Sequence, residues 1–208
     1  MNSSRLVPVM STAILLTCGC ASERGAFSMN SKIPPECLAT CERLNIAPTK
    51  DVLAVSIASQ SVALFEEGKC IKHFPCSTSR FGIGQIAGSN CTPLGLHCIA
   101  EKIGGGEPPG TVFKSRKVIG NTSQPEFANA KITTRILWLE GLESGLNKGF
   151  NGDVNVDSHA RYIYIHGTGD QETIGEPASH GCIHLADDDL LWLFDRLPSG
   201  SLVWIAEH

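Results

Sequence analysis

The sequence lacks concentrated charge and the common ligand-binding loops. Its 17 basic and 21 acidic residues give a net charge of −4, and neither sign forms a long run. This balance excludes the electrostatic footprint of a protein that binds nucleic acid or an anionic membrane surface. The glycine-rich stretch 103–110 lacks the Gly-Lys-Ser/Thr ending of a phosphate loop, so we interpret it as a surface loop. Asp153-x-Asn155-x-Asp157 lacks the turn glycine and closing glutamate of a calcium loop, and we expect no cofactor.

The start of the chain lacks an apolar run long enough to cross a bilayer. Residues 1–20 carry Arg5 in a polar segment, are interrupted by Pro8, and end in Cys18-Gly19-Cys20. This pattern is typical of a signal peptide for export. Gly19-Cys20 resembles the cleavage site of bacterial lipoprotein signals, which implies a lipid on Cys20. We therefore expect an exported protein of the periplasm or cell envelope, anchored to a membrane by lipid, with simple secretion or an uncleaved anchor as alternatives.

Hydrophobic periodicity predicts one mostly β domain with few short helices and no internal repeat. We interpret residues 21–50 as a tether with a short cysteine-containing segment, helical near 37–44, and residues 51–206 as the folded domain. Alternating and β-branched runs predict strands at 52–57, 61–65, 70–74, 96–103, 132–139 and 202–205. Asp187-Asp188-Asp189, followed by apolar residues at helical spacing, predicts a helix with acidic residues in its first turn. We expect a monomer.

Nine cysteines support the prediction of export. Without Cys18, Cys20 and a reactive Cys182, six remain, and an oxidising compartment would allow them to pair. A Pro-Gly turn separates Cys91 from Cys98, which favours a disulfide between them. We then expect disulfides that join the N-terminal segment to the third predicted strand. These would link Cys37 and Cys41 to Cys70 and Cys76.

Three of the seven histidines and one cysteine lie within residues 166–184. The β-branched and aromatic run 161–165 predicts a strand that ends at His166, and Gly167 begins a loop. Cys182 follows in a loop just before the predicted helix. A cysteine becomes nucleophilic as a thiolate, and a nearby imidazole can accept its proton. Gly181 allows close approach of a substrate, and neighbouring amides could bind an oxyanion, so the stretch indicates a site of acyl transfer.

Two other interpretations of this cluster remain open. A buried cysteine is often an inert small apolar residue, and histidines are often only hydrogen-bonded core groups. Zinc could be bound by His180, Cys182 and His184 with His166 as a fourth ligand. Alternate residues of an extended segment share one face, however, and leave little room to surround a tetrahedral ion. A papain-like peptidase is disfavoured because its cysteine precedes its histidine in sequence.

The motif residues also carry a specific resemblance. Ile165-His166-Gly167-Thr168 and Pro177-Ala178-Ser179-His180-Gly181-Cys182-Ile183-His184-Leu185 resemble the signature of YkuD-type L,D-transpeptidases. Upstream, Ser77-Thr78-Ser79 is similar to the Ser-Thr-Gly of that family, and Thr92-Pro93-Leu94-Gly95 to its Thr-Pro-x-Gly turn. The resemblance covers roughly residues 51–206 and implies the family's β-sandwich.

The resemblance also implies roles for individual residues. Cys182 would be the nucleophile, His166 its acid/base partner, and His180 a supporting residue. Backbone groups would stabilise the oxyanion, while two side chains of the motif would contact the substrate. The backbone groups are those of Gly167, Gly181 and Cys182, and the substrate contacts are Ser179 and His184. In this family the position of His184 usually carries Arg or Asn, so substrate contacts at this position differ.

The substrate implied by this family is the stem peptide of peptidoglycan. Cys182 would form a thioester with release of D-alanine, and an amine of a second stem would complete a 3→3 cross-link. With water as the acceptor the same chemistry would make an L,D-carboxypeptidase. A peptidoglycan-binding module without activity is a further alternative, and Cys182 would then be inert to thiol reagents.

Overall fold

The computed structural model describes residue 28 and residues 31–208, and the predicted signal peptide and Cys20 lie outside these residues. The helices are α1 (Pro35–Arg43) and α2 (Asp187–Arg196), with short 3-10 turns at Pro125–Phe127 and Gln171–Thr173. The strands are β1 (Asp51–Ser56), β2 (Ser61–Glu66), β3 (Lys69–Ser77), β4 (Gly95–Ile103), β5 (Thr111–Lys114), β6 (Lys117–Asn121), β7 (Thr133–Gly141), β8 (Phe150–Asn151), β9 (Val154–Asn155), β10 (Tyr164–Gly167), β11 (Ile183–Leu185) and β12 (Leu202–Ala206). Among the residues that the structure describes, no helix is long and apolar enough to cross a membrane. The prediction of a mostly β protein with few short helices is confirmed.

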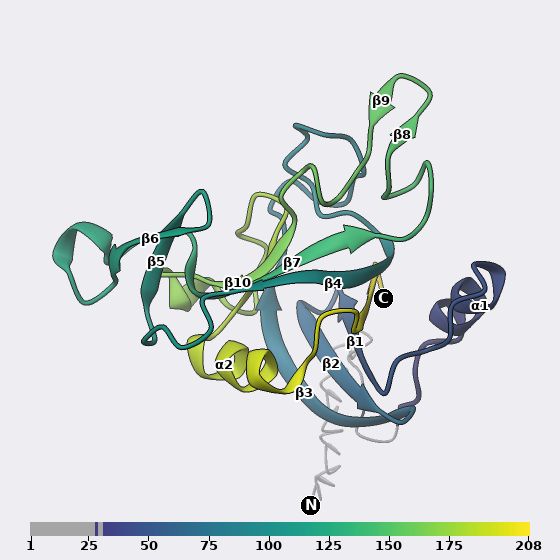
Figure 1. Cartoon of the computed structure of the whole chain (residues 1–208), viewed down its shortest axis with the longest axis horizontal. Helices are drawn as coiled ribbons and strands as arrows, with labels where there is room; N and C mark the ends of the chain where they lie inside the picture. The colour runs from purple at the N-terminus through teal and green to yellow at the C-terminus, as the bar shows by residue number, and fades with distance from the viewer. Residues whose placement is uncertain (1–27, 29–30) are drawn as a thin grey trace, which may run out of the picture.

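Ten of the strands form one sheet that closes on itself (Figure 1). Their order is β10-β11-β3-β2-β1-β12-β4-β7-β5-β6, and β10 pairs with β7 as well as with β11. The first eight strands of this order therefore make a ring, and the β5–β6 hairpin continues from β7 outside it. The long strand β7 pairs with β4 along one edge and with β10 along the other.

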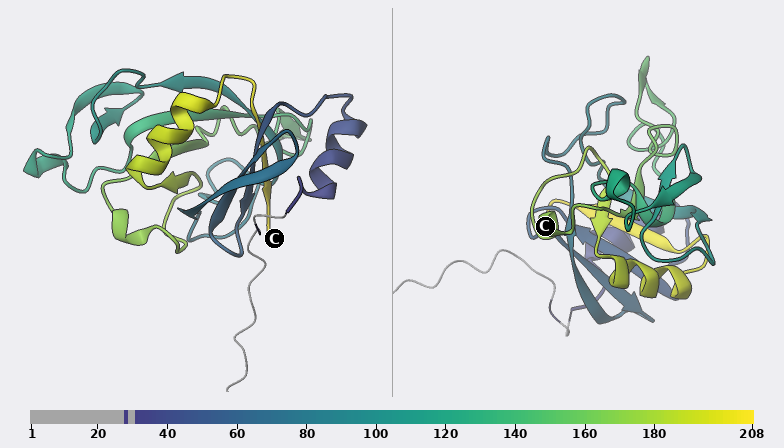
Figure 2. Two further views of the ribbon diagram at one scale, coloured as in Figure 1. Left: turned by 90° about the horizontal axis from the view of Figure 1, so that it is seen from below. Right: turned by 90° about the vertical axis from the view of Figure 1, so that its left-hand side faces the viewer.

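Both faces of the central strands are buried, so apolar residues alternate between different clusters. Leu53 and Val55 of β1 belong to the interior cluster, which α2 also lines. Val52 and Ala54 of the same strand belong to a second cluster, which α1 covers. Figures 1 and 2 show the two helices at separate sides of the sheet. A third cluster, around Trp138, lies where β7 and β10 pair.

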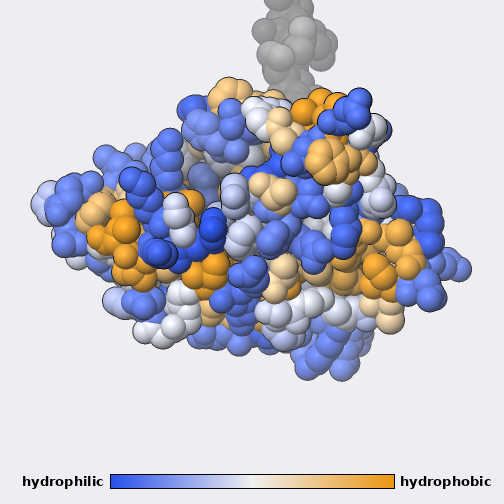
Figure 3. All heavy atoms as spheres, turned by 45° about the horizontal axis from the view of Figure 1, so that its top comes forward, coloured by the Kyte–Doolittle hydropathy of each residue, from blue (hydrophilic) through white to orange (hydrophobic). Residues whose placement is uncertain are grey.

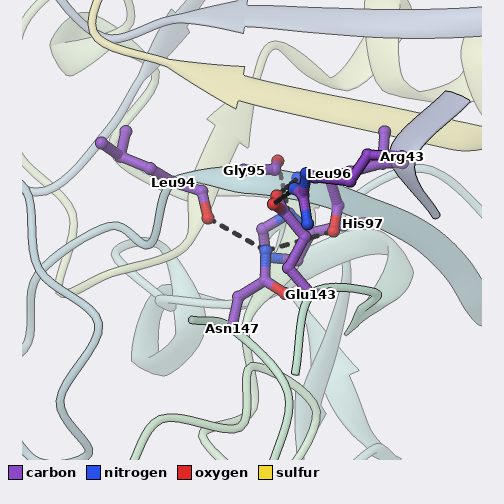
Figure 4. Close-up of polar contacts among 7 residues, drawn as sticks. All are labelled: Arg43, Leu94, Gly95, Leu96, His97, Glu143 and Asn147. Atoms are coloured by element: carbon purple, nitrogen blue, oxygen red, sulfur yellow. Dashed lines mark hydrogen bonds and ion pairs between the residues drawn. The ribbon is translucent and has the colours of Figure 1, made fainter. Parts of the chain in front are cut away.

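A buried polar network fixes the Thr-Pro-Leu-Gly turn before β4 (Figure 4). Glu143 Oε1 accepts a hydrogen bond from the Leu96 amide at 2.8 Å, and its other oxygen lies 2.5 Å from the guanidinium of Arg43 on α1. Asn147 donates to the carbonyls of Leu94 and Leu96 at 3.0 and 3.1 Å. These bonds satisfy the carboxylate and amide groups that burial would otherwise penalise. The turn is thereby connected to α1 and to the segment after β7.

Most of the strands predicted from sequence are confirmed within a few residues, with three differences. The hairpins β5–β6 and β8–β9 were not predicted, and neither was the short strand β11. The run 161–165 becomes strand only from Tyr164, because residues 157–162 form turns and Tyr162 has a φ of 58°. A turn at this point sets where the strand that carries His166 begins.

The predicted disulfides are wrong in this structure, where all seven described cysteines are free. Cys37, Cys41 and Cys70 lie in the cluster that α1 covers, whereas Cys76 lies in the interior cluster. The sheet separates these clusters, so Cys76 is not placed to pair with the helix. The Cys91 thiol instead contacts the carbonyl of Phe81 at 3.2 Å. Sequence spacing alone did not reveal which face of the sheet each cysteine occupies.

Candidate active site

The candidate nucleophile and base line the same cavity because β10 and β11 pair in parallel. In this register Ile165 lies opposite Ile183, and His166 lies opposite His184. The two isoleucines point into the interior cluster, so their sequence neighbours point to the other face. Cys182, just before β11, therefore lies on the same side as His166 and His184. All three side chains line one cavity of about 500 Å³.

Cys182 is half-buried against the third apolar cluster, next to Tyr164. Its thiol donates to the Tyr162 carbonyl at 3.4 Å and accepts from the Tyr164 amide at 3.4 Å. Burial raises the pKa of this thiol to about 11, while the Tyr164 amide and the charge of Arg161 oppose the rise. The resting residue is therefore a thiol, and it needs a proton acceptor in order to react.

His166 is buried and suited to accept that proton. Its Nδ1 lies 2.7 Å from the Gly167 carbonyl, which makes Nδ1 the protonated nitrogen and Nε2 the acceptor. Among the described residues, no group forms a hydrogen bond with Nε2. Burial lowers the pKa of His166 to about 4, so the ring is neutral near pH 7.

The other two histidines of the motif differ in their surroundings. The ring of His184 lies 4.6 Å from that of His166, and its buried Nδ1 has no hydrogen-bond partner among the described residues. Burial, followed by the neighbouring His166 and His180, lowers the pKa of His184 to about 3. His180 is exposed, and its Nε2 accepts a hydrogen bond from Arg80 at 2.6 Å. Desolvation and the charges of Arg80 and Lys131 lower the pKa of His180.

Ser179 and the two glycines hold the backbone around Cys182. Ser179 is fully buried, donates to the Cys182 carbonyl at 2.6 Å and accepts from the Gly181 amide at 3.2 Å. This geometry favours a positioning role over the predicted substrate contact, and it occupies one amide predicted for the oxyanion. Gly181 has a φ of +116°, which L side chains rarely adopt. Gly167 offers its carbonyl to His166, and a Cβ there would lie 2.6 Å from an oxygen of Asp187.

The cavity contains charged side chains that the sequence did not indicate. Arg80 and Lys131 bring positive charge to it and Asp170 brings negative charge. Arg80 directly follows the Ser-Thr-Ser stretch, and this position was the only sequence signal that could have drawn attention to it. The lining residues are Arg80, Asn129, Lys131, Ile132, His166, Thr168, Asp170, Thr173, Ala178, His180, Cys182 and His184.

Polar and apolar side chains are mixed over the surface shown in Figure 3. Apolar side chains gather at the left end of that view, on the side where Figure 1 places the β5–β6 hairpin. Val118 and Ile119 of β6 are among the exposed large apolar residues. For the zinc interpretation, no group of three or more His, Cys, Asp or Glu side chains in the described part of the chain is arranged to hold a metal ion.

Comparison with known proteins identifies the family of this chain. Residues 50–205 match the YkuD family, described as the L,D-transpeptidase catalytic domain. A 47-residue stretch is 40% identical to YqjB of Bacillus subtilis (strain 168), whose assignment as an L,D-transpeptidase is provisional. This stretch covers 23% of the chain and 27% of YqjB.

Solved structures with similar folds include an L,D-transpeptidase from Mycobacterium smegmatis, with a TM-score of 0.46 and 19% identity. That match covers 76% of this chain and 58% of the other. Another is the L,D-transpeptidase segment 123–326 from Xylanimonas cellulosilytica DSM 15894, with a TM-score of 0.46 and 14% identity over 86% of this chain and 97% of the other. Because the match to the YkuD family spans most of the sequence, the chain belongs to the YkuD family of L,D-transpeptidase catalytic domains.

Proposed function

We propose that the protein is a peptidoglycan L,D-transpeptidase that joins stem peptides through a cysteine thioester. The observation that carries this proposal is the parallel pairing of β10 with β11, which gives Cys182 and His166 one cavity. The Nδ1 bond of His166 leaves Nε2 available as a base, which acyl transfer by a thiol requires. Membership of the YkuD family supports the same reaction class.

The reaction begins with a neutral pair. Because the pKa of the thiol is raised and that of the imidazole is lowered, full proton transfer before attack is unfavourable. The Cys182 proton therefore moves to His166 Nε2 as sulfur attacks the carbonyl between the third stem residue and the terminal D-alanine. The imidazolium then gives this proton to the leaving nitrogen, and D-alanine departs from the thioester.

The second half of the reaction returns the site to its starting state. An amine of an acceptor stem attacks the thioester carbonyl, and His166 takes a proton from the attacking nitrogen. The C–S bond breaks, the new amide forms the 3→3 cross-link, and the proton returns from His166 to sulfur. If water replaces the amine, the product is a free carboxylate, and the enzyme is an L,D-carboxypeptidase.

The charges of the cavity support a stem peptide as the ligand. Such a peptide ends in a carboxylate, and Arg80 and Lys131 supply positive charge beside Cys182. His184 is neutral near pH 7 because of its lowered pKa. It therefore does not supply the positive charge that arginine would give at this position, where the family usually carries Arg or Asn. We infer that Arg80 and Lys131 take over this part of carboxylate recognition.

The proposed setting is the bacterial cell envelope. The basis is the export-signal pattern and the cysteine after Gly19, both in the sequence outside the described residues. We propose a processed, lipid-modified Cys20 and a monomeric enzyme that meets peptidoglycan outside the cytoplasmic membrane. Intact-mass analysis of protein from the membrane fraction tests this, and an unmodified chain starting at Met1 would contradict it.

The activity is tested by incubating the purified protein with defined tetrapeptide stems and weighing the products. The proposed function requires release of D-alanine and a product with the mass of two joined stems. Release of D-alanine with only tripeptide formed would identify a carboxypeptidase. Retention of intact tetrapeptide, with binding but no thioester, would leave only a peptidoglycan-binding module. Cys182→Ala is the matched control, because it keeps the cavity and removes the sulfur.

A further inference from the structure

Arg161 lies behind Cys182 and is bound by backbone oxygen atoms. It is half-buried in the turn that precedes β10. Its guanidinium donates to the carbonyls of Gly84 and Gln85 at 3.2 and 2.7 Å and to the carbonyl of Cys91 at 2.7 Å. Contacts 70 to 77 positions away in sequence thus converge on a single side chain.

The charge of Arg161 is not neutralised by an acid. Among the described residues, no carboxylate forms an ion pair with it. The nearby Asp157 instead uses its two oxygens to accept the amides of Ala160 and Gly149 at 2.9 and 2.8 Å. A half-buried guanidinium with only carbonyl partners keeps its full positive charge, and its field acts strongly in surroundings from which water is excluded.

The loop bound by Arg161 touches the residue before Cys182. A Cβ added to Gly181 would lie 3.2 Å from the Cys91 carbonyl oxygen, which is the atom that Arg161 holds. The next residue after Arg161, Tyr162, accepts the hydrogen bond of the Cys182 thiol. Arg161 is therefore connected to the nucleophile from two sides, through the 84–91 loop and through its own turn.

Several other titratable or charged groups surround Cys182. The effect of Arg161 on the Cys182 thiolate depends on the charges of these groups. The three histidines of the cavity have lowered pKa values and are neutral near pH 7. Arg116 lies over the rings of Trp138 and Tyr162 and is bonded to the Tyr164 hydroxyl. The Cys91 thiol also interacts electrostatically with Arg161. The groups that face this region are Arg80, Cys91, Arg116, Lys131, Arg161, Tyr162, Tyr164, His166, Asp170, His180 and His184.

We propose that Arg161 is a positioning residue of the active site, which fixes the 84–91 loop against Gly181 and stabilises the Cys182 thiolate by its unpaired positive charge. The two effects have different requirements. Any cation at this position can act on the thiolate, whereas only the planar guanidinium, with its several donors, can hold three carbonyls at once. The proposal rests on the proposed function only in taking Cys182 as the nucleophile.

The test compares Arg161→Met and Arg161→Lys with the wild-type protein. Alkylation of Cys182 by iodoacetamide is followed from pH 7 to 11 by peptide mass mapping, which needs no substrate. With Arg161→Met, the pH at which alkylation reaches half its maximum should rise. The rate at pH 8 should then fall about tenfold for each unit of that rise. Arg161→Lys should stay near the wild-type profile, because it keeps the charge.

Hydrogen exchange measures the second effect in the same variants. The amides of Gly84, Ala87 and Ser89 form hydrogen bonds in the loop and should exchange faster in both variants. Arg135→Met is the matched control, since Arg135 is also a buried arginine bonded to a carbonyl but lines no part of this cavity. If Arg161→Met does not fold, faster loop exchange in Arg161→Lys remains the required result. Wild-type loop exchange in Arg161→Lys, or a wild-type alkylation profile in folded Arg161→Met, would overturn the proposal.

These outcomes are separate from the failure of the proposed function. If the stem peptides give neither thioester nor product, the transpeptidase proposal fails, while the alkylation profile still reports on Arg161 and Cys182. If the peptides react and the profile of Arg161→Met is unchanged, the role of Arg161 fails alone.

Discussion

Two buried histidines have the same lowered pKa but differ in what their second nitrogen does. Burial lowers the pKa of both His97 and His166 to about 4. His97 uses both nitrogens within the fold, with Nδ1 at 3.0 Å from the Gly95 carbonyl and Nε2 at 2.9 Å from the Ser158 hydroxyl. His166 uses only Nδ1 and lines the cavity that contains Cys182. The shifted pKa therefore reports burial, and it is the available nitrogen in a cavity that supports His166 as the proposed base.

The cysteines show the same contrast. Burial raises the pKa of Cys76 to about 12 and that of Cys182 to about 11. Cys76 belongs to the interior cluster, whereas Cys182 reaches the cavity beside His166. Access to a cavity that His166 also lines, and not the degree of pKa shift, separates the proposed nucleophile from the core residue.

The largest expected effect comes from removing the sulfur of Cys182, and removing the sulfur of Cys76 is the comparison. A carbapenem-type β-lactam or a donor stem should leave one acyl adduct on Cys182, and Cys182→Ala should show none. Cys182→Ser should be nearly inactive, because an alcohol is far harder to deprotonate than a thiol. Cys76→Ala should keep the adduct and lose stability through the cavity it creates. An adduct mapped by mass spectrometry to Cys76, or to any residue other than Cys182, would contradict the assignment.

The next largest effect on acylation is expected from substitution of His166, with His97 as the comparison. His166→Ala should slow acylation about 10²–10⁴-fold, because it removes the proposed general acid and base. His97→Gln should acylate at close to the wild-type rate while its thermal midpoint falls, since a fully bonded core group is replaced. Acylation rates are compared by mass spectrometry, with circular dichroism as the check on folding. Equal slowing in both variants would show that the available nitrogen does not distinguish the two residues.

The pH dependence of stability follows from the lowered pKa that His97 and His166 share. Their folded pKa values, about 4, lie below the ordinary value of 6.5, so the unfolded chain binds more protons between these limits. The free energy of unfolding should therefore decrease as the pH falls from 6.5 towards 4, by a few kcal/mol at most for each residue. Urea unfolding at pH 7 and pH 5 measures this, and His97→Gln should show a smaller decrease. An equal decrease in the variant would mean that His97 titrates normally in the folded protein.

The smallest effect is expected at His184, which is neither a fully hydrogen-bonded core residue like His97 nor the proposed base like His166. Its Nδ1 is buried without a partner in the described structure, yet its ring lines the cavity next to His166. His184→Asn should slow acylation by about tenfold or less, roughly the contribution of one hydrogen bond. Rates at saturating and limiting donor concentration separate a binding effect from a chemical one. Slowing as large as that of His166→Ala would make His184 a second base.

The sequence predicted those parts of the fold and site that depend on local periodicity. Many of the strands have clear apolar alternation, and the motif predicted His166 at the end of a strand. It did not predict β11 or its parallel pairing with β10, which gives Cys182 and His166 one cavity. Arg80 meets His180 over 100 positions and Arg161 meets Cys91 over 70, so neither contact has a local pattern. The disulfide prediction failed for the same reason, because spacing along the chain does not tell which side of a sheet a thiol occupies.

The closed ring of strands restricts how a peptide can approach His166. Strand β10 pairs with β7 along one edge and with β11 along the other, so its backbone donors and acceptors are not available to a ligand along these edges. A substrate cannot be recognised here as an added strand, which would demand a regular backbone of L residues. In the proposed function, recognition passes instead to side chains that line the cavity, such as Arg80 and Lys131, and these can accept a peptide that contains D residues. Because the edges of β10 are already paired, binding does not require the backbone of the ligand to match that of a regular strand of L residues.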